Sequence, residues 1–274
     1  MATLPNPLPT LATDPSGRAL GLHLPAGALV DTTDEGAWHE PLLWCADERA
    51  VPGGWTALEP ARLRGLLPVV LDVGDGHGGP DRWELAPGEV SYPGDHDAGE
   101  VLAECWEEYA AEAHAWPGLA EPLPQESRDR SRNQDQNHDH DPDAVATRVA
   151  DSLLADGGPL KAPRLALVPA RRSADIPTAI GWTGPANHEG DTARLSAVLR
   201  SWEDRFGIRV VALGFDHLLV SVAAPPVTMA DAEAVAAEHF AFCPDNVRQG
   251  TDPTVRAYAE HQVLDQPVWH FWWD

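Results

Sequence analysis

Three residues near the C-terminal end are of types that support nucleophilic or metal chemistry. His239 and Cys243 stand four positions apart in a helical pattern, which places them on one helix face, and Asp245 follows just past the helix end. A Cys–His pair with a carboxylate can form a nucleophile set or part of a metal site. The same face carries Val235 and Phe240, and a thiol at a helix C-terminus meets an unfavourable dipole. We therefore expect core packing for the pair and keep catalysis as the alternative.

Two other strings have the residue types of binding sites. His138 and His140 alternate with aspartates in a run of charges and amides, so they could hold a divalent ion weakly, but not in a built site. The glycine-rich run at 74–79 follows an expected strand, yet it lacks the lysine of a phosphate-binding loop and the spacing of a dinucleotide motif. We interpret this run as a turn.

Aromatic side chains crowd the last strand that the pattern predicts. Alternation places Trp269, Phe271 and Trp273 on one face of that strand, and His270 with Trp272 on the other. Because tryptophan is enriched in binding hot spots, Trp269, Trp272 and Trp273 are candidate binding residues, with core packing as the competing interpretation.

The elements that position these residues form a predicted C-terminal domain over 144–274. Capping residues, apolar periodicity and a hairpin signal predict the order β-α-β-β-α-β. The expected elements are a strand at 164–169, a helix after Asp191, strands at 208–213 and 218–222, a helix after Thr228 and a strand at 268–274. This order predicts an α+β fold, a two-layer sandwich that is ferredoxin-like or related.

The remaining chain divides into a predicted N-terminal part, 1–120, and a linker, 121–143. The linker is acidic and polar with almost no aliphatic residues, which is typical of a flexible segment. The N-terminal part is mixed and β-rich, with expected strands at 20–24, 42–45 and 66–73 and a helix that begins after Asp97 and ends before Pro117.

Four strings of the C-terminal domain resemble a known family: HFAFCPDNVRQG, WHFWWD, VVALGFDHLLVSVAAPP and LRSWEDRFG. They resemble the bacterial family of domain of unknown function 4253, which is common in Streptomyces-like organisms. The resemblance covers about residues 164–274 and implies no activity, no cofactor and no catalytic residues.

The charge balance restricts the classes of partner. The chain carries 43 acidic and 19 basic residues, a formal net charge of −24, which repels phosphate backbones and anionic membranes and favours a basic protein partner. Three cysteines without a CxxC pair indicate no disulfide framework. The first residues contain neither a basic segment nor a continuous apolar one, so we expect a cytoplasmic protein without a signal peptide.

Together these observations favour a non-catalytic binding or interaction protein, of a regulatory or immunity type. The absence of a recognisable catalytic motif makes an enzyme the less favoured class, and we expect no cofactor. The alternative is a small hydrolase or transferase that uses His239, Cys243 and Asp245, joined by Asp216 and His217 of the hairpin.

Overall fold

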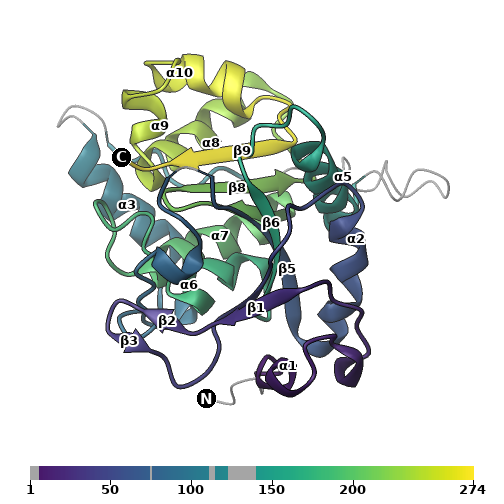
Figure 1. Cartoon of the computed structure of the whole chain (residues 1–274). Coiled ribbons are helices and arrows are strands. Elements are labelled where there is room, and N and C mark those ends of the chain that lie inside the picture. The colour runs from purple at the N-terminus through teal and green to yellow at the C-terminus, as the bar shows by residue number, and fades with distance from the viewer. Residues whose placement is uncertain (1–5, 75, 111–114, 123–139) are drawn as a thin grey trace.

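A central mixed sheet with helices on both faces forms the protein (Figure 1). A computed structural model of the chain describes residues 6–74, 76–110, 115–122 and 140–274. The seven strands follow the order β1-β4-β6-β5-β7-β8-β9, and β5 and β7 are parallel while the other neighbours are antiparallel. They are β1 (Gly27–Val30), β4 (Leu43–Ala46), β5 (Leu66–Asp72), β6 (Pro163–Pro169), β7 (Ile208–Leu213), β8 (His217–Val222) and β9 (Val268–Trp272). A separate hairpin pairs β2 (Thr32–Thr33) with β3 (Gly36–Ala37).

The helices around the sheet range from single turns to α7, which has 15 residues. The α-helices are α1 (Pro9–Thr13), α2 (Gly54–Leu58), α3 (Ala98–Tyr109), α5 (Pro142–Leu154), α6 (Ile176–Ile180), α7 (Thr192–Phe206), α8 (Met229–Phe242), α9 (Asp245–Arg248) and α10 (Val255–Tyr258). Short 3₁₀ helices are η1 (Arg18–Leu20), η2 (Glu59–Arg64), η3 (Pro80–Arg82), η4 (Pro93–Asp95) and η6 (Ser173–Asp175), and η7 (Ala259–Val263) is a π-helix.

Two apolar cores lie on opposite faces of the sheet. One lies under α3, α6, α7 and α8 and includes Trp202, Phe206 and Phe271, while the other lies under α1, α2 and α5 and includes Trp44 and Trp55. Figure 1 shows α2 and α5 on one side of the strands and α3, α6 and α7 on the other. The mixed α and β class is confirmed, but the two-layer arrangement is wrong, because α5 packs on β7 and β8 from the face opposite α7.

The order of the strands does not confirm the ferredoxin-like variant. The predicted succession of elements from β6 to β9 is correct, but β5 lies between β6 and β7, and β7, β8 and β9 form an antiparallel meander. The two parts that the sequence analysis separates at 121–143 thus contribute strands to one sheet. Most of the predicted linker, residues 123–139, lies outside the described residues.

Strand β5 is central because both of its faces are apolar. All seven of its residues are buried, as expected for a strand between two layers of helices. Pro68 lacks the N–H that a central strand normally donates, but the β5–β7 pairing involves only Val70 and Leu71, so Pro68 lies beyond it.

Local signals determine where the helices begin and end. Asp97, Asp191 and Thr228 accept hydrogen bonds from the first turns of α3, α7 and α8, as their N-cap positions predict. Gly207 has φ 64° directly after α7, a left-handed conformation that favours glycine. Two expectations are wrong: α3 ends at Tyr109 rather than near Pro117, and no strand forms at 20–24, where η1 ends at Leu20.

Candidate functional site

His239 and Cys243 lie inside the core between α8 and the sheet. Both side chains are completely buried, and the His239 ring contacts the rings of Trp202, Trp269 and Phe271 at centroid distances of 4.9, 4.5 and 4.8 Å. The helix face that carries them is therefore the apolar stripe that the sequence predicts.

A chain of polar contacts connects the two residues through side chains that sequence reasoning missed. His239 Nδ1 lies 3.2 Å from Tyr258 Oη, and Asn246 Nδ2 donates to the same oxygen at 3.0 Å. The thiol of Cys243 lies 3.4 Å from Asn246 Oδ1 and 3.0 Å from the carbonyl oxygen of Trp272. This chain joins α8, α9, α10 and β9 into one packed unit.

Burial keeps the members of this chain neutral. Desolvation raises the pKa of Cys243 to about 12 and also raises the pKa of Tyr258. Desolvation, with a contribution from the Arg205 guanidinium, lowers the pKa of His239 to about 3. A neutral thiol is a poor nucleophile, so the geometry and the charge states describe a hydrogen-bonded core.

The Asp245 carboxylate makes its hydrogen bonds with groups other than the side chains of His239 and Cys243. Its Oδ2 atom lies 2.9 Å from His188 Nε2 and accepts the backbone N–H of Asp274 at 3.1 Å. The carboxylate thus fixes the end of the chain beside β9, and no hydrogen bond joins it to the side chain of His239 or Cys243 among the described residues.

Asp216, in the turn between β7 and β8, forms a separate pair with His217, the first residue of β8. Their side chains meet at 3.2 Å, between Asp216 Oδ1 and His217 Nδ1, and the His217 ring lies 6.0 Å from the ring of His270. Backbone contacts anchor the turn, because Trp273 donates to the carbonyl oxygen of Asp216 at 3.0 Å. Among the described residues, no hydrogen bond joins the side chain of Asp216 or His217 to the polar chain around His239.

The aromatic strand β9 faces the core as its alternation predicts. Trp269, Phe271 and Trp273 are buried, whereas His270 is exposed and Trp272 is half-buried. The outer edge of β9 is covered by Asn246, which accepts from Trp272 N at 3.0 Å and donates to the His270 carbonyl oxygen at 2.6 Å. One side chain therefore satisfies two backbone groups that a neighbouring strand would otherwise pair.

The metal hypothesis concerns residues at the boundary of the described chain. His138 lies outside the described residues, and His140 Nδ1 lies 3.2 Å from the carbonyl oxygen of Ala223. The described residues contain no group of three or more side chains able to hold a metal ion.

A shallow hollow lies far from all of these residues in the sequence, between the β2–β3 hairpin and residues 86–89. Its volume is about 90 Å³, and its walls include Trp38, Glu35 and Glu89. This volume is below the range of about 300–1,000 Å³ that is typical of small-molecule sites. No helix in the described part of the chain is both apolar enough and long enough to cross a bilayer.

The segment from β6 to the C-terminal strand contains the strings that the sequence analysis singled out, and they pack together around β9. Residues 164–274 match the family model of domain of unknown function DUF4253. This DUF4253 segment spans β6 through β9, and the N-terminal half adds β5 to the middle of its sheet. No curated protein and no solved structure matches the chain.

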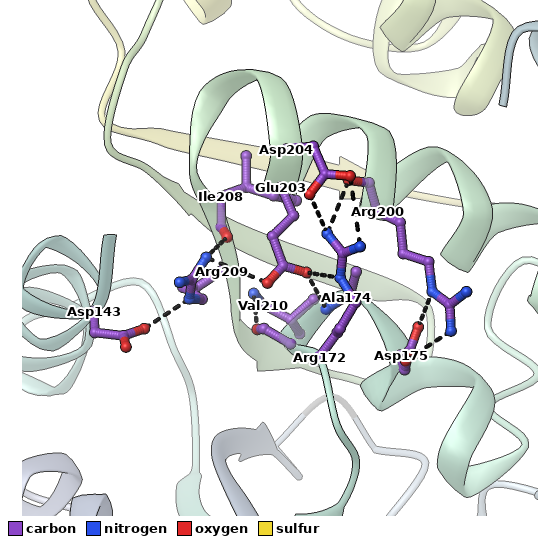
Figure 2. Close-up of polar contacts among 11 residues, drawn as sticks. Asp143, Arg172, Ala174, Asp175, Arg200, Glu203, Asp204, Ile208, Arg209 and Val210 are labelled. Atoms are coloured by element: carbon purple, nitrogen blue, oxygen red, sulfur yellow. Dashed lines mark hydrogen bonds and ion pairs between the residues drawn. The ribbon is translucent and has the colours of Figure 1, made fainter. Parts of the chain in front are cut away.

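A network of ion pairs joins the DUF4253 segment to α5 (Figure 2). Arg209 Nε lies 2.7 Å from Asp143 of α5, and its Nη1 lies 3.4 Å from Glu203. Arg172 approaches Glu203 at 3.2 Å and Asp204 at 2.6 Å. Arg62 also approaches Asp143, at 3.3 Å, so three arginines face three carboxylates near the junction of α7 and β7, and we interpret the network as structural.

The exposed side of α3 has a different character. Glu100, Glu104 and Glu108 follow one another at four-residue spacing, Glu107 lies beside them, and all four are exposed. We call these four residues the acidic face of α3. Arg194 pairs with Glu104 at 2.7 Å.

Proposed function

We propose that this is a cytoplasmic, non-catalytic binding protein, of a regulatory or immunity type, that holds a basic protein partner on the acidic face of α3. The observation that carries the proposal is the spacing of Glu100, Glu104 and Glu108. Like charges at i, i+4 destabilise a helix by about 0.2–0.5 kcal/mol per pair. Arg194 offsets the charge of Glu104 alone, so the exposed side of α3 keeps an excess of negative charge that is well suited to complement a cationic surface.

The use of arginine supports the same proposal. The chain has only 19 basic residues against 43 acidic ones. Several of its arginines already form ion pairs with carboxylates of the same chain, namely Arg62, Arg172, Arg194, Arg200, Arg205, Arg209 and Arg256. The excess carboxylates create a negative field that speeds association with a basic protein and disfavours nucleic acid and anionic membranes.

A hydrolase or transferase has less support from the described geometry. His239 and Cys243 are fully buried, and their pKa values of about 3 and about 12 favour the neutral forms near pH 7. The Asp245 carboxylate hydrogen-bonds His188 and not the side chain of His239 or Cys243.

The test is a pull-down in which the acidic face of α3 is neutralised. In the test variant Glu100, Glu107 and Glu108 are changed to glutamine, and Glu104 is kept because it pairs with Arg194. Glutamine can serve at the third position of α3, and the loss of like-charge repulsion offsets the lost attraction between Glu100 and the helix dipole. The melting temperature of the variant should therefore stay close to that of the wild type. We expect a basic protein, recovered with the wild type from cells of the source organism, to be lost with this variant and to elute at raised salt.

A control variant removes the same charge elsewhere. Asp47, Glu48 and Asp156 are exposed and lie after β4 and α5. They are changed to asparagine, glutamine and asparagine, and the partner should still bind. Equal recovery with the α3 variant, or recovery of no basic protein with the wild type, would refute the proposal.

A further inference from the structure

A buried ion pair lies under α3 in the core between α7 and α8. Arg205 of α7 donates from Nη1 and Nη2 to the two carboxylate oxygens of Glu238 of α8, at 2.7 and 2.6 Å. Trp202 Nε1 adds a third hydrogen bond to Glu238, at 2.7 Å. The Glu238 side chain has no exposed surface. We call Arg205 and Glu238 the buried pair.

The buried pair binds the backbone of a distant residue. Ala120 donates its N–H to Glu238 Oε1 at 2.6 Å and accepts from Arg205 Nη1 at its carbonyl oxygen at 2.9 Å. Both backbone groups of one residue are thereby satisfied by two side chains of opposite charge. Hydrogen bonds to ionised groups are stronger than hydrogen bonds between neutral groups. The two hydrogen bonds of Ala120 involve only its backbone, so they require nothing of the side chain at this position except that it be small.

The rest of segment 115–122 lies against α3 without forming a helix or a strand. Trp116 packs on the ring of Trp106 of α3 at a centroid distance of 5.5 Å, and Trp106 contacts Phe240 of α8 at 5.6 Å. Leu119 lies over Gly99: a Cβ atom placed on Gly99 would be 3.5 Å from Leu119 Cδ1. The segment therefore packs along α3, α7 and α8, with an aromatic contact at one end and the buried pair at the other, and we call the surface that it covers the groove.

The buried pair is better explained by recognition than by stability. Replacement of a buried ion pair by apolar residues of similar volume is often neutral or stabilising, so two charges in an aromatic core need another reason to be present. Here the pair determines the register of an extended segment through its main chain. This mode of binding tolerates different sequences, because backbone groups are common to all residues.

We propose that this groove is a docking site for an extended segment of a protein partner, and that residues 115–122 occupy it in cis as an internal stand-in. The partner segment presents a large aromatic residue and, four positions later, a small residue whose backbone binds the buried pair. The partner segment carries lysine or arginine after the small residue, where this chain has the exposed Glu121, because a protein with a net charge of −24 favours a cationic segment. The basic character of the partner rests on the function proposed above, whereas the groove itself does not.

The experiment uses a labelled peptide with the sequence of residues 115–122 and the full-length protein. Ala120→Pro removes the backbone N–H that Glu238 accepts and so weakens the internal segment. Trp116→Ala weakens it at the other end and leaves the buried pair untouched. A tethered segment competes at an effective concentration of about millimolar, so we expect both variants to bind the peptide at least about tenfold more tightly than the wild type does.

Control peptides separate the groove from its charge preference. The Ala120→Pro peptide should not bind either variant, because it cannot donate to Glu238. The Glu121→Lys peptide should bind more tightly than the native one at low salt, and the difference should shrink as salt rises.

The proposal fails if the peptide binds the wild type and both variants equally, or if it binds neither variant while their melting temperatures stay close to that of the wild type. It also fails if the Ala120→Pro peptide binds as well as the native peptide. Binding of the native peptide without any basic partner in the pull-down would support the groove and refute the proposed function, so the two failures are distinguishable.

Discussion

The reactivity of Cys243 distinguishes a binding protein from a thiol enzyme. Its pKa of about 12 results first from desolvation. At pH 7.5 a free cysteine with a pKa of about 8.5 is roughly one-tenth thiolate, whereas a group with a pKa of 12 is thiolate in only about 3 parts in 100,000. Because the thiolate is the reacting form, Cys243 should react with iodoacetamide about 3,000-fold more slowly than free cysteine, before any further protection by burial.

The assay uses three single-cysteine variants, in which the other two cysteines are changed to alanine, and measures labelling by mass spectrometry from pH 6.5 to 9.5. Burial also raises the pKa values of Cys45 and Cys105, each to about 11. Cys105 is half-buried and should react first, and Cys243 should react last. In denaturant all three should react at the rate of free cysteine.

Fast labelling of Cys243 alone, with a midpoint below about pH 8, would refute this reasoning. It would mean that His239 activates the thiol and that the native state exposes it. The enzyme alternative would then become the better explanation of the cluster.

Three further results are expected from urea unfolding followed by circular dichroism. Glu238→Leu or Arg205→Met alone should cost about 3–5 kcal/mol, and the two substitutions combined should cost less than the sum of the single ones. A strictly additive double variant would contradict the buried pairing. Trp202→Ala should cost about 3–5 kcal/mol, since the side chain is fully buried, and a loss under about 1 kcal/mol would show that its packing is misassigned. The free energy of unfolding should fall as the pH drops below about 6.5, because His239 takes up a proton in the unfolded state but not in the folded state, where its pKa is about 3. One such group changes the free energy of unfolding by at most about 1.4 kcal/mol per pH unit, and His239→Phe should reduce this pH dependence. An unchanged pH dependence would contradict the assignment.

Features determined by neighbouring residues were predictable from the sequence. The caps at Asp97, Asp191 and Thr228 and the hairpin of β7 and β8 each depend on a few adjacent positions. The alternation that buries Trp269 and exposes His270 is equally local.

Features that depend on distant partners were not predictable. The run at 20–24 contains three leucines without β-branched neighbours, and Gly21 adopts a left-handed φ of 74° there, which ends η1 instead of extending a strand. The insertion of β5 between β6 and β7 has no local signal, since a continuous apolar run is compatible with any central position in a sheet.

The candidate groove was hidden for a different reason. Ala120 has no functional group in its side chain. It contributes only its backbone N–H and carbonyl, which every residue except proline has. Asn246 and Tyr258 also lack a motif, because their roles come from the way α9 and α10 fold back on β9. Searches for reactive side chains pass over residues of this kind.

The central position of β5 has a consequence for the biosynthesis of the protein. The ribosome releases β5 about ninety residues before β6, so this buried strand must wait, with both edges unpaired, for its two neighbours. Conversely, a gene fragment encoding only 164–274 would produce β6 and β7 with no strand between them, and their open edges would favour aggregation. The ends of the family match therefore do not coincide with a complete sheet, and a truncation that preserves the order of the strands has to keep β5.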